Sequence, residues 1–113
     1  MMTVNTAEAL ARLDDDREIY EELIEAFLQD SPADMNNLRT AVSALDMVKI
    51  AYHAHKIKGA ALTLGAERLS NCAEILEKAA RKEEDADYPA LFRDMEAEYT
   101  TAAEELASFN RSR

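Results

Sequence analysis

The chain has 113 residues, 48% of them hydrophobic, which is enough to bury one core. It is rich in helix-forming residues but has only 2 glycines, 2 prolines and no tryptophan, so we expect an all-α protein that forms a single domain over residues 1–113. Its formal net charge of -10 argues against nucleic acid or an anionic membrane as the partner, because both favour basic surfaces.

Helix start and stop signals divide the first half of the chain. Asn5 caps a short opening helix, which should end in the three aspartates at 14–16. One of these aspartates caps a second predicted helix over residues 17–29. The pair Ser31-Pro32 matches an N-cap followed by proline at the first helical position, which predicts a new helix from there to about Leu45.

The second half of the chain has equally clear boundaries. Asp46 caps the next predicted helix, and Gly65 is its expected left-handed terminator. A further helix covers residues 66–82, a charged turn follows, and Pro89 opens a long last helix. Short connections favour antiparallel neighbours, so the sequence predicts an antiparallel up-down four-helix bundle with a short extra N-terminal helix.

Both histidines and both glycines fall between residues 51 and 69. The expected core stripe of this helix consists of Met47, Ile50, Ala54, Ile57, Ala61 and Leu64. At about 100° per residue, His55 lies beside the stripe, whereas His53 points to a side that we expect to be solvated. The two histidines cannot chelate one metal from a regular helix, and no Glu-x-x-His or Cys/His cluster completes a set, so we expect no metal site.

Lys58 and Gly59 follow His55 by three and four residues and therefore share its helix face. Glycine inside a helix costs about 1 kcal/mol relative to alanine, so Gly59 suggests that empty space is needed beside the imidazole. Lys58 adds a cation within reach of that space. A histidine, a cation and open space on one helical turn are typical of a nucleophile that accepts a phosphoryl group.

A nucleophilic His55 needs one ring nitrogen free and the other held by an acceptor. A hairpin that turns at Gly65 sets His55 opposite the region of Glu74 and Glu77, and we favour Glu77 as the acceptor. Other interpretations exist for each residue alone. A histidine beside a core stripe is often an ordinary boundary residue, and Gly59 alone is equally consistent with close helix packing.

The segment AHKIKGAALTLGAERLSNCAEILEKAAR, residues 54–81, resembles the histidine-containing phosphotransfer (HPt) domains of multistep phosphorelays. Their signature is His-x-x-Lys-Gly, five residues, a second Gly, and then a Leu-rich helix. The residues in register with it are His55, Lys58, Gly59, Gly65, Leu69, Cys72, Leu76 and Glu77. His53 does not fit, because the lysine three residues later is followed by Ile57.

The resemblance implies that His55 accepts a phosphoryl group from the aspartyl phosphate of one receiver domain and passes it to the aspartate of another. It also implies that Lys58 steadies the phosphoryl group, that Gly59 keeps the site open and that Glu77 bonds the second imidazole nitrogen. The implied partners are receiver domains of response regulators and hybrid histidine kinases. The docking surface is expected to include Leu10, Leu13, Ala51, Tyr52, Lys56 and Leu62.

The chain has no glycine-rich nucleotide loop and no kinase ATP motif, so we expect neither a cofactor nor an ATP-dependent kinase activity of its own. Any Mg²⁺ should come from the receiver. A single cysteine, the absence of a secretory signal pattern and the lack of an apolar run of about 20 residues predict a cytoplasmic protein without a membrane partner. A monomer is the default expectation.

Two alternatives stay open at this point. A phosphoacceptor domain of a chemotaxis-type kinase has the same His-x-x-Lys-Gly core, although the short chain disfavours it because such domains belong to longer proteins. A helical adaptor or anti-regulator that only binds partners would keep the fold without the chemistry. The retention of His55 with Lys58 and Gly59 disfavours this second alternative, because an adaptor needs none of them.

Overall fold

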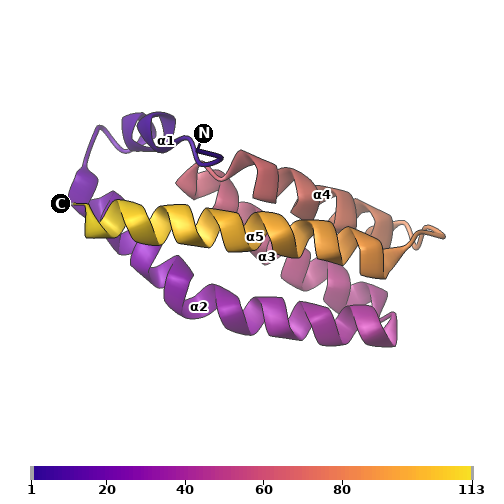
Figure 1. The fold of residues 1–113 in the computed structure, drawn as a ribbon. Coiled ribbons are helices and arrows are strands. Elements are labelled where there is room, and N and C mark those ends of the chain that lie inside the picture. Colours follow the sequence, from indigo (N-terminus) through magenta and orange to yellow (C-terminus); the bar gives the residue numbers. More distant parts are fainter. Residues whose placement is uncertain (1, 113) are drawn as a thin grey trace.

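The structure is a computed structural model that describes residues 2–112. These residues form five helices and no strand: α1 (Thr6–Arg12), α2 (Arg17–Ala44), α3 (Met47–Leu64), α4 (Glu67–Arg81) and α5 (Tyr88–Arg111). The four long helices run side by side, and α1 lies at one end of the bundle (Figure 1). The predicted all-α four-helix bundle with a short N-terminal helix is confirmed. None of the helices within residues 2–112 combines the length and apolar content needed to cross a bilayer.

Side-chain caps begin four of the helices. Asn5, Asp16, Asp46 and Asp87 each accept a hydrogen bond from the backbone amide three residues later, at 3.0 to 3.2 Å. Each bond satisfies an amide that has no partner within its own helix. The predicted caps at Asn5 and Asp46 are therefore confirmed.

The predicted helix boundary at Ser31 and Pro32 is wrong, because α2 continues through both residues. Pro32 has no amide proton for the carbonyl of Leu28, so the helix loses one backbone hydrogen bond there. The Ser31 hydroxyl donates to the carbonyl of Phe27 instead of capping a new helix. Phe27 and Met35, on either side of the proline, are both buried in the core, and this burial keeps the two halves in one helix that bends near its middle (Figure 1).

The core lies between the four long helices, and each of them contributes to it. Its largest fully buried side chains are Tyr20, Ile24, Leu38, Ile50, Ile57, Leu64, Leu69, Leu76, Met95 and Leu106. The predicted stripe of α3 is confirmed except at Met47, which is only partly buried. Because this stripe faces the core, the remaining faces of α3 are available to solvent and to its neighbours.

The N-terminal segment braces the turn between α3 and α4. The amide of Asn5 donates to the carbonyl of Gly65 at 2.9 Å, and the Arg12 guanidinium donates to the carbonyl of Leu62 at 2.8 Å. On α5, the Glu105 carboxylate accepts from two backbone amides of the same segment, at 2.7 and 2.9 Å. The segment before α1 thus connects the α3–α4 turn with α5.

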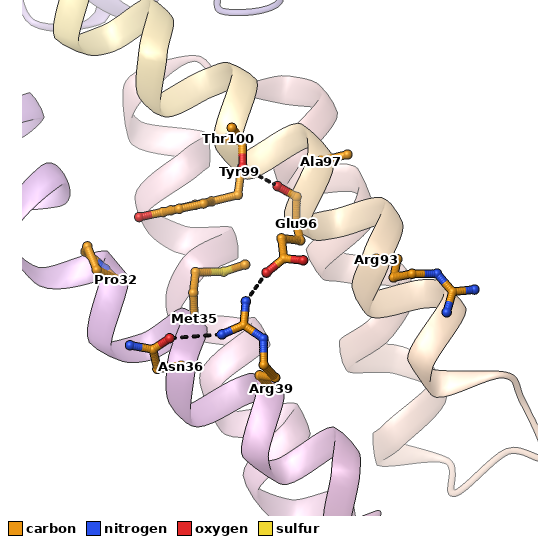
Figure 2. A pocket seen from close by; sticks show the side chains of 9 residues that line it. All are labelled: Pro32, Met35, Asn36, Arg39, Arg93, Glu96, Ala97, Tyr99 and Thr100. Carbon is orange, nitrogen blue, oxygen red and sulfur yellow. Dashed lines mark hydrogen bonds and ion pairs between the residues drawn. The ribbon is translucent and has the colours of Figure 1, made fainter.

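Figure 2 shows an open groove between α2 and α5. Arg39 of α2 reaches across it to pair with Glu96 of α5, and its guanidinium also lies over the ring of Phe92, 5.5 Å from the ring centroid. The groove is lined by Pro32, Met35, Asn36, Arg39, Arg93, Glu96, Ala97, Tyr99 and Thr100. None of these lining residues belongs to the set that the sequence singled out for phosphotransfer, which is on α1 and its C-cap Leu13, on α3 and on α4.

The two glycines should respond oppositely to alanine. At Gly65, φ is +84°, and an added Cβ would lie 2.5 Å from the backbone oxygen of Asn5, so Gly65→Ala should destabilise the fold by about 1–3 kcal/mol. At Gly59, inside α3, a Cβ meets nothing within 4 Å, so Gly59→Ala should stabilise it by up to about 1 kcal/mol. Urea unfolding measures the free energy of unfolding of both variants. Equal losses of stability in the two variants would contradict this account.

Candidate functional site

The first element of the site is the exposed imidazole of His55 on α3. The cap at Asp46 and the left-handed residue Gly65 bound this helix, and its apolar stripe fixes its rotation against the core. This rotation leaves His55 at the edge of the buried face, with its side chain 59% exposed. The ring is therefore open to an approaching molecule.

The second element is the Glu77 carboxylate, which α4 brings against the ring. After the turn at Gly65, α4 packs beside α3, and Oε2 of Glu77 lies 3.0 Å from Nδ1 of His55. Glu77 is only 5% exposed. Glu74, the other carboxylate considered from the sequence, pairs instead with Lys78 at 3.3 Å. Glu77 is thus the carboxylate beside the imidazole.

This contact determines which nitrogen of a neutral ring is free. An ionised carboxylate only accepts hydrogen bonds, so Nδ1 of His55 must carry the proton that it donates to Glu77. Nε2 then keeps its lone pair and can act as a nucleophile. The arrangement is that of a ring held by one nitrogen and reactive at the other.

Two cations accompany the buried carboxylate. The ammonium nitrogen of Lys58 lies 2.8 Å from Oε1 of Glu77, and Nε of Arg81 lies 2.8 Å from Oε2. Burial by itself would raise the pKa of Glu77, but hydrogen bonds from Lys58 and Arg81, together with the positive charge of Lys58, lower that pKa to about 2. Glu77 is therefore an anion at neutral pH.

Lys58 and Gly59 lie one turn beyond His55, as their spacing predicts. The Lys58 side chain is 22% exposed and directed at Glu77, so its ammonium group is not aimed outward into solvent. Gly59 is exposed, and a Cβ at this position would have no heavy atom within 4 Å. The backbone on this side of the imidazole is bare.

Exposed apolar side chains continue the His55 face along α3. Tyr52 and Leu62, both expected at the docking surface, are 58% and 53% exposed. Val48, which the sequence analysis missed, lies two turns before His55 and is 81% exposed. Its spacing of seven residues from His55 was the available signal.

The other residues expected at a docking surface are buried, partly buried or already paired within the protein. Ala51 is a correction: it is 6% exposed, because it borders the core stripe of α3 and packs inward. Leu10 and Leu13 are partly buried against the core. Lys56 is half-exposed, but its ammonium group pairs with Asp34 of α2 at 3.1 Å.

His53 lies on a different face of α3 from His55. Lys49 and Lys56 on this side are exposed as expected, but His53 itself is not solvated, because its side chain is 14% exposed and its Nδ1 lies 3.1 Å from Asp34. The contact with α2 makes His53 part of the α2–α3 packing. Over residues 2–112, no three His, Cys, Asp or Glu side chains are grouped so that they could hold a metal ion.

Comparisons with known proteins identify the family and the fold of this chain. The family model for the Hpt domain matches residues 22–108. The fold is similar to the crystal structure of histidine-containing phosphotransfer protein B (HptB) from Pseudomonas aeruginosa PAO1, with 28% identity, a TM-score of 0.84, and 94% of this chain and 93% of that chain covered.

A second similar structure is the HPT domain from the Hpt sensor hybrid histidine kinase from Shewanella, with a TM-score of 0.88 and 98% and 96% of the two chains covered. Its 17% identity supports the fold alone. No curated protein matches the chain. The resemblance predicted from the sequence is confirmed by the family match.

Acid titration should reveal Glu77 as a stabilising anion. Its folded pKa of about 2 is below the ordinary 4.5, so its contribution to stability, about 3 kcal/mol, is complete above about pH 4.5 and is lost as the pH falls through about 2. Urea unfolding of the wild type and of Glu77→Gln at several pH values measures this contribution to the free energy of unfolding. The stability difference between the two proteins should shrink in acid, and a pH-independent difference would contradict the assignment.

Proposed function

This chain belongs to the Hpt domain family of histidine phosphotransfer proteins, and we propose from this premise that His55 carries a phosphoryl group between receiver domains. The observation that carries the proposal is the exposed imidazole whose Nδ1 faces a buried, ionised carboxylate. This pairing leaves Nε2 free to attack. The proposed partners are receiver domains of response regulators and hybrid histidine kinases.

The proposed transfer is an in-line displacement at phosphorus. The Nε2 lone pair of His55 forms the N–P bond while the P–O bond to the donor aspartate breaks, and the bonding electrons leave with the aspartate carboxylate. The proton on Nδ1 remains hydrogen-bonded to Glu77, whose negative charge stabilises the positive charge that develops on the ring. The reverse displacement then delivers the group to the aspartate of a second receiver.

We propose that Lys58 and Gly59 serve the phosphoryl group and the incoming partner, respectively. Lys58 has a flexible stem on the same helix face as His55, so its ammonium group can turn from Glu77 toward an anion on Nε2. Gly59 leaves the backbone bare where a receiver must approach. Exposed Val48, Tyr52 and Leu62 provide separate apolar contacts along the His55 face that suit transient docking.

We propose that the protein works as a cytoplasmic monomer and has no cofactor of its own, with Mg²⁺ supplied by the receiver. Its net charge of -10 supports a partner other than nucleic acid. No further candidate function is favoured by a specific contact among residues 2–112.

Transfer of labelled phosphoryl tests the proposal. A receiver domain loaded from radiolabelled acetyl phosphate should pass acid-labile, alkali-stable label to the wild-type chain, whereas His55→Gln should accept none, because the attacking nitrogen is lost. His53→Gln is the matched control and should label like the wild type, since His53 contacts Asp34 on another face. Receiver binding without labelling of the wild type would favour an adaptor instead.

Gly59→Glu should separate docking from folding. Because Gly59 is exposed and an added Cβ meets no heavy atom within 4 Å, the variant should fold normally yet bind a receiver domain at least about tenfold more weakly, as measured by calorimetry. Gly59→Ala, which adds only a methyl group, should retain most of the affinity. Wild-type affinity and transfer rate in Gly59→Glu would refute the proposed role of the bare backbone.

A further inference from the structure

The Glu77 carboxylate pairs with two cations, although a single cation would balance its charge. Lys58 contacts Oε1 at 2.8 Å, while Arg81 contacts Oε2 at 2.8 Å and shares that oxygen with Nδ1 of His55. A buried carboxylate needs compensation, because desolvation disfavours its charged form. The second cation needs a further explanation.

The two cations are held in different ways. Arg81 follows Glu77 by four residues on α4, so helix geometry itself keeps the pair together. Lys58 comes from α3 and lies one turn beyond His55, so it alone of the two shares a helix face with the ring. Lys58 can therefore reach an anion on the ring, whereas the Nε of Arg81 is directed at the carboxylate.

We propose that Arg81 is a positioning residue that keeps the Glu77 carboxylate charged and directed at Nδ1 of His55 while Lys58 turns to the phosphoryl group. The inference rests on the proposed function and deepens it. With Arg81 present, the departure of Lys58 leaves one cation on Glu77. Without Arg81, a Lys58 ammonium group that turns to the phosphoryl group leaves the buried carboxylate with no cation.

The charged and titratable groups that contact Glu77 are His55 and Lys58 from α3 and Arg81 from α4. A Glu77 carboxylate that loses both cations is protonated more readily, because desolvation raises its pKa, and a protonated carboxyl is a poorer acceptor for the proton on Nδ1. The ring would then lose the contact that keeps Nε2 free.

Nuclear magnetic resonance of the unphosphorylated chain tests the positioning role without any receiver. Arg81→Ala should raise the pKa of the Glu77 carboxyl by about one unit or more, seen in its carbon shift, because a hydrogen-bonded cation is lost. Arg81 bonds the same Oε2 that faces Nδ1, so its loss should also let this oxygen move away from the ring, and the ring nitrogen shifts of His55 should report a smaller share of the Nδ1–H tautomer. Arg81→Lys should restore both readouts in part, and Lys78→Ala, which removes a cation from the same turn of α4, should leave them unchanged.

Transfer rates then separate positioning from direct action. Arg81→Ala should slow labelling from a phosphorylated receiver domain by about tenfold, in the range seen when a residue that orients a reactive group is removed. In the Glu77→Gln background, Arg81→Ala should change the rate by less than about twofold, because a neutral amide needs no counter-ion. The double variant therefore isolates the effect that passes through the carboxylate.

Two results would overturn the inference. One is an Arg81→Ala chain whose Glu77 titration and His55 tautomer match the wild type. The other is an equal rate loss from Arg81→Ala in the wild-type and Glu77→Gln backgrounds, which would mean that Arg81 acts directly on the phosphoryl group or the partner. If the wild-type chain accepts no label, the proposed function fails, and the titration alone then decides whether Arg81 positions Glu77.

Discussion

The site depends on the hydrogen bond between the Glu77 carboxylate and Nδ1 of His55, at 3.0 Å. This contact can exist only if α3 and α4 keep one register, because each helix contributes one partner. It also requires a buried anion, which desolvation opposes and which Lys58 and Arg81 compensate. The helix packing, the charge on the carboxylate and the free nitrogen of the ring are therefore parts of one arrangement.

The turn at Gly65 fixes how α4 lies against α3 and connects this helix pair to the N-terminal segment. Its left-handed conformation ends α3, and its missing side chain lets the backbone of Asn5 approach the turn closely. The amide of Asn5 then bonds to the carbonyl of Gly65, and nearby Tyr20 donates to the carbonyl of Leu64 at 2.7 Å. Contacts from α2 and from the N-terminal segment thus brace the hairpin that carries the site.

Three features of the structure differ from the prediction because of packing beyond the local sequence pattern. A proline after a serine is a valid helix start by local rules, yet α2 continues because Phe27 and Met35 are buried on both sides of it. Ala51 borders the stripe that local periodicity identifies, and the actual packing of α3 turns it inward. His53 was expected in solvent, but Asp34 of α2 contacts it. In each case packing against the rest of the fold, which local sequence rules do not include, decides the outcome.

The sequence by itself determined the helices other than the continuous α2, most of their caps and the grouping of His55, Lys58 and Gly59 on one face, because these depend on spacings within a single helix. Only the tertiary structure decided that Glu77 and not Glu74 meets the ring, that Lys58 lies against this carboxylate and that Val48 extends the exposed face. These features depend on the register and rotation of helices against one another, which long-range packing sets and local spacing does not encode.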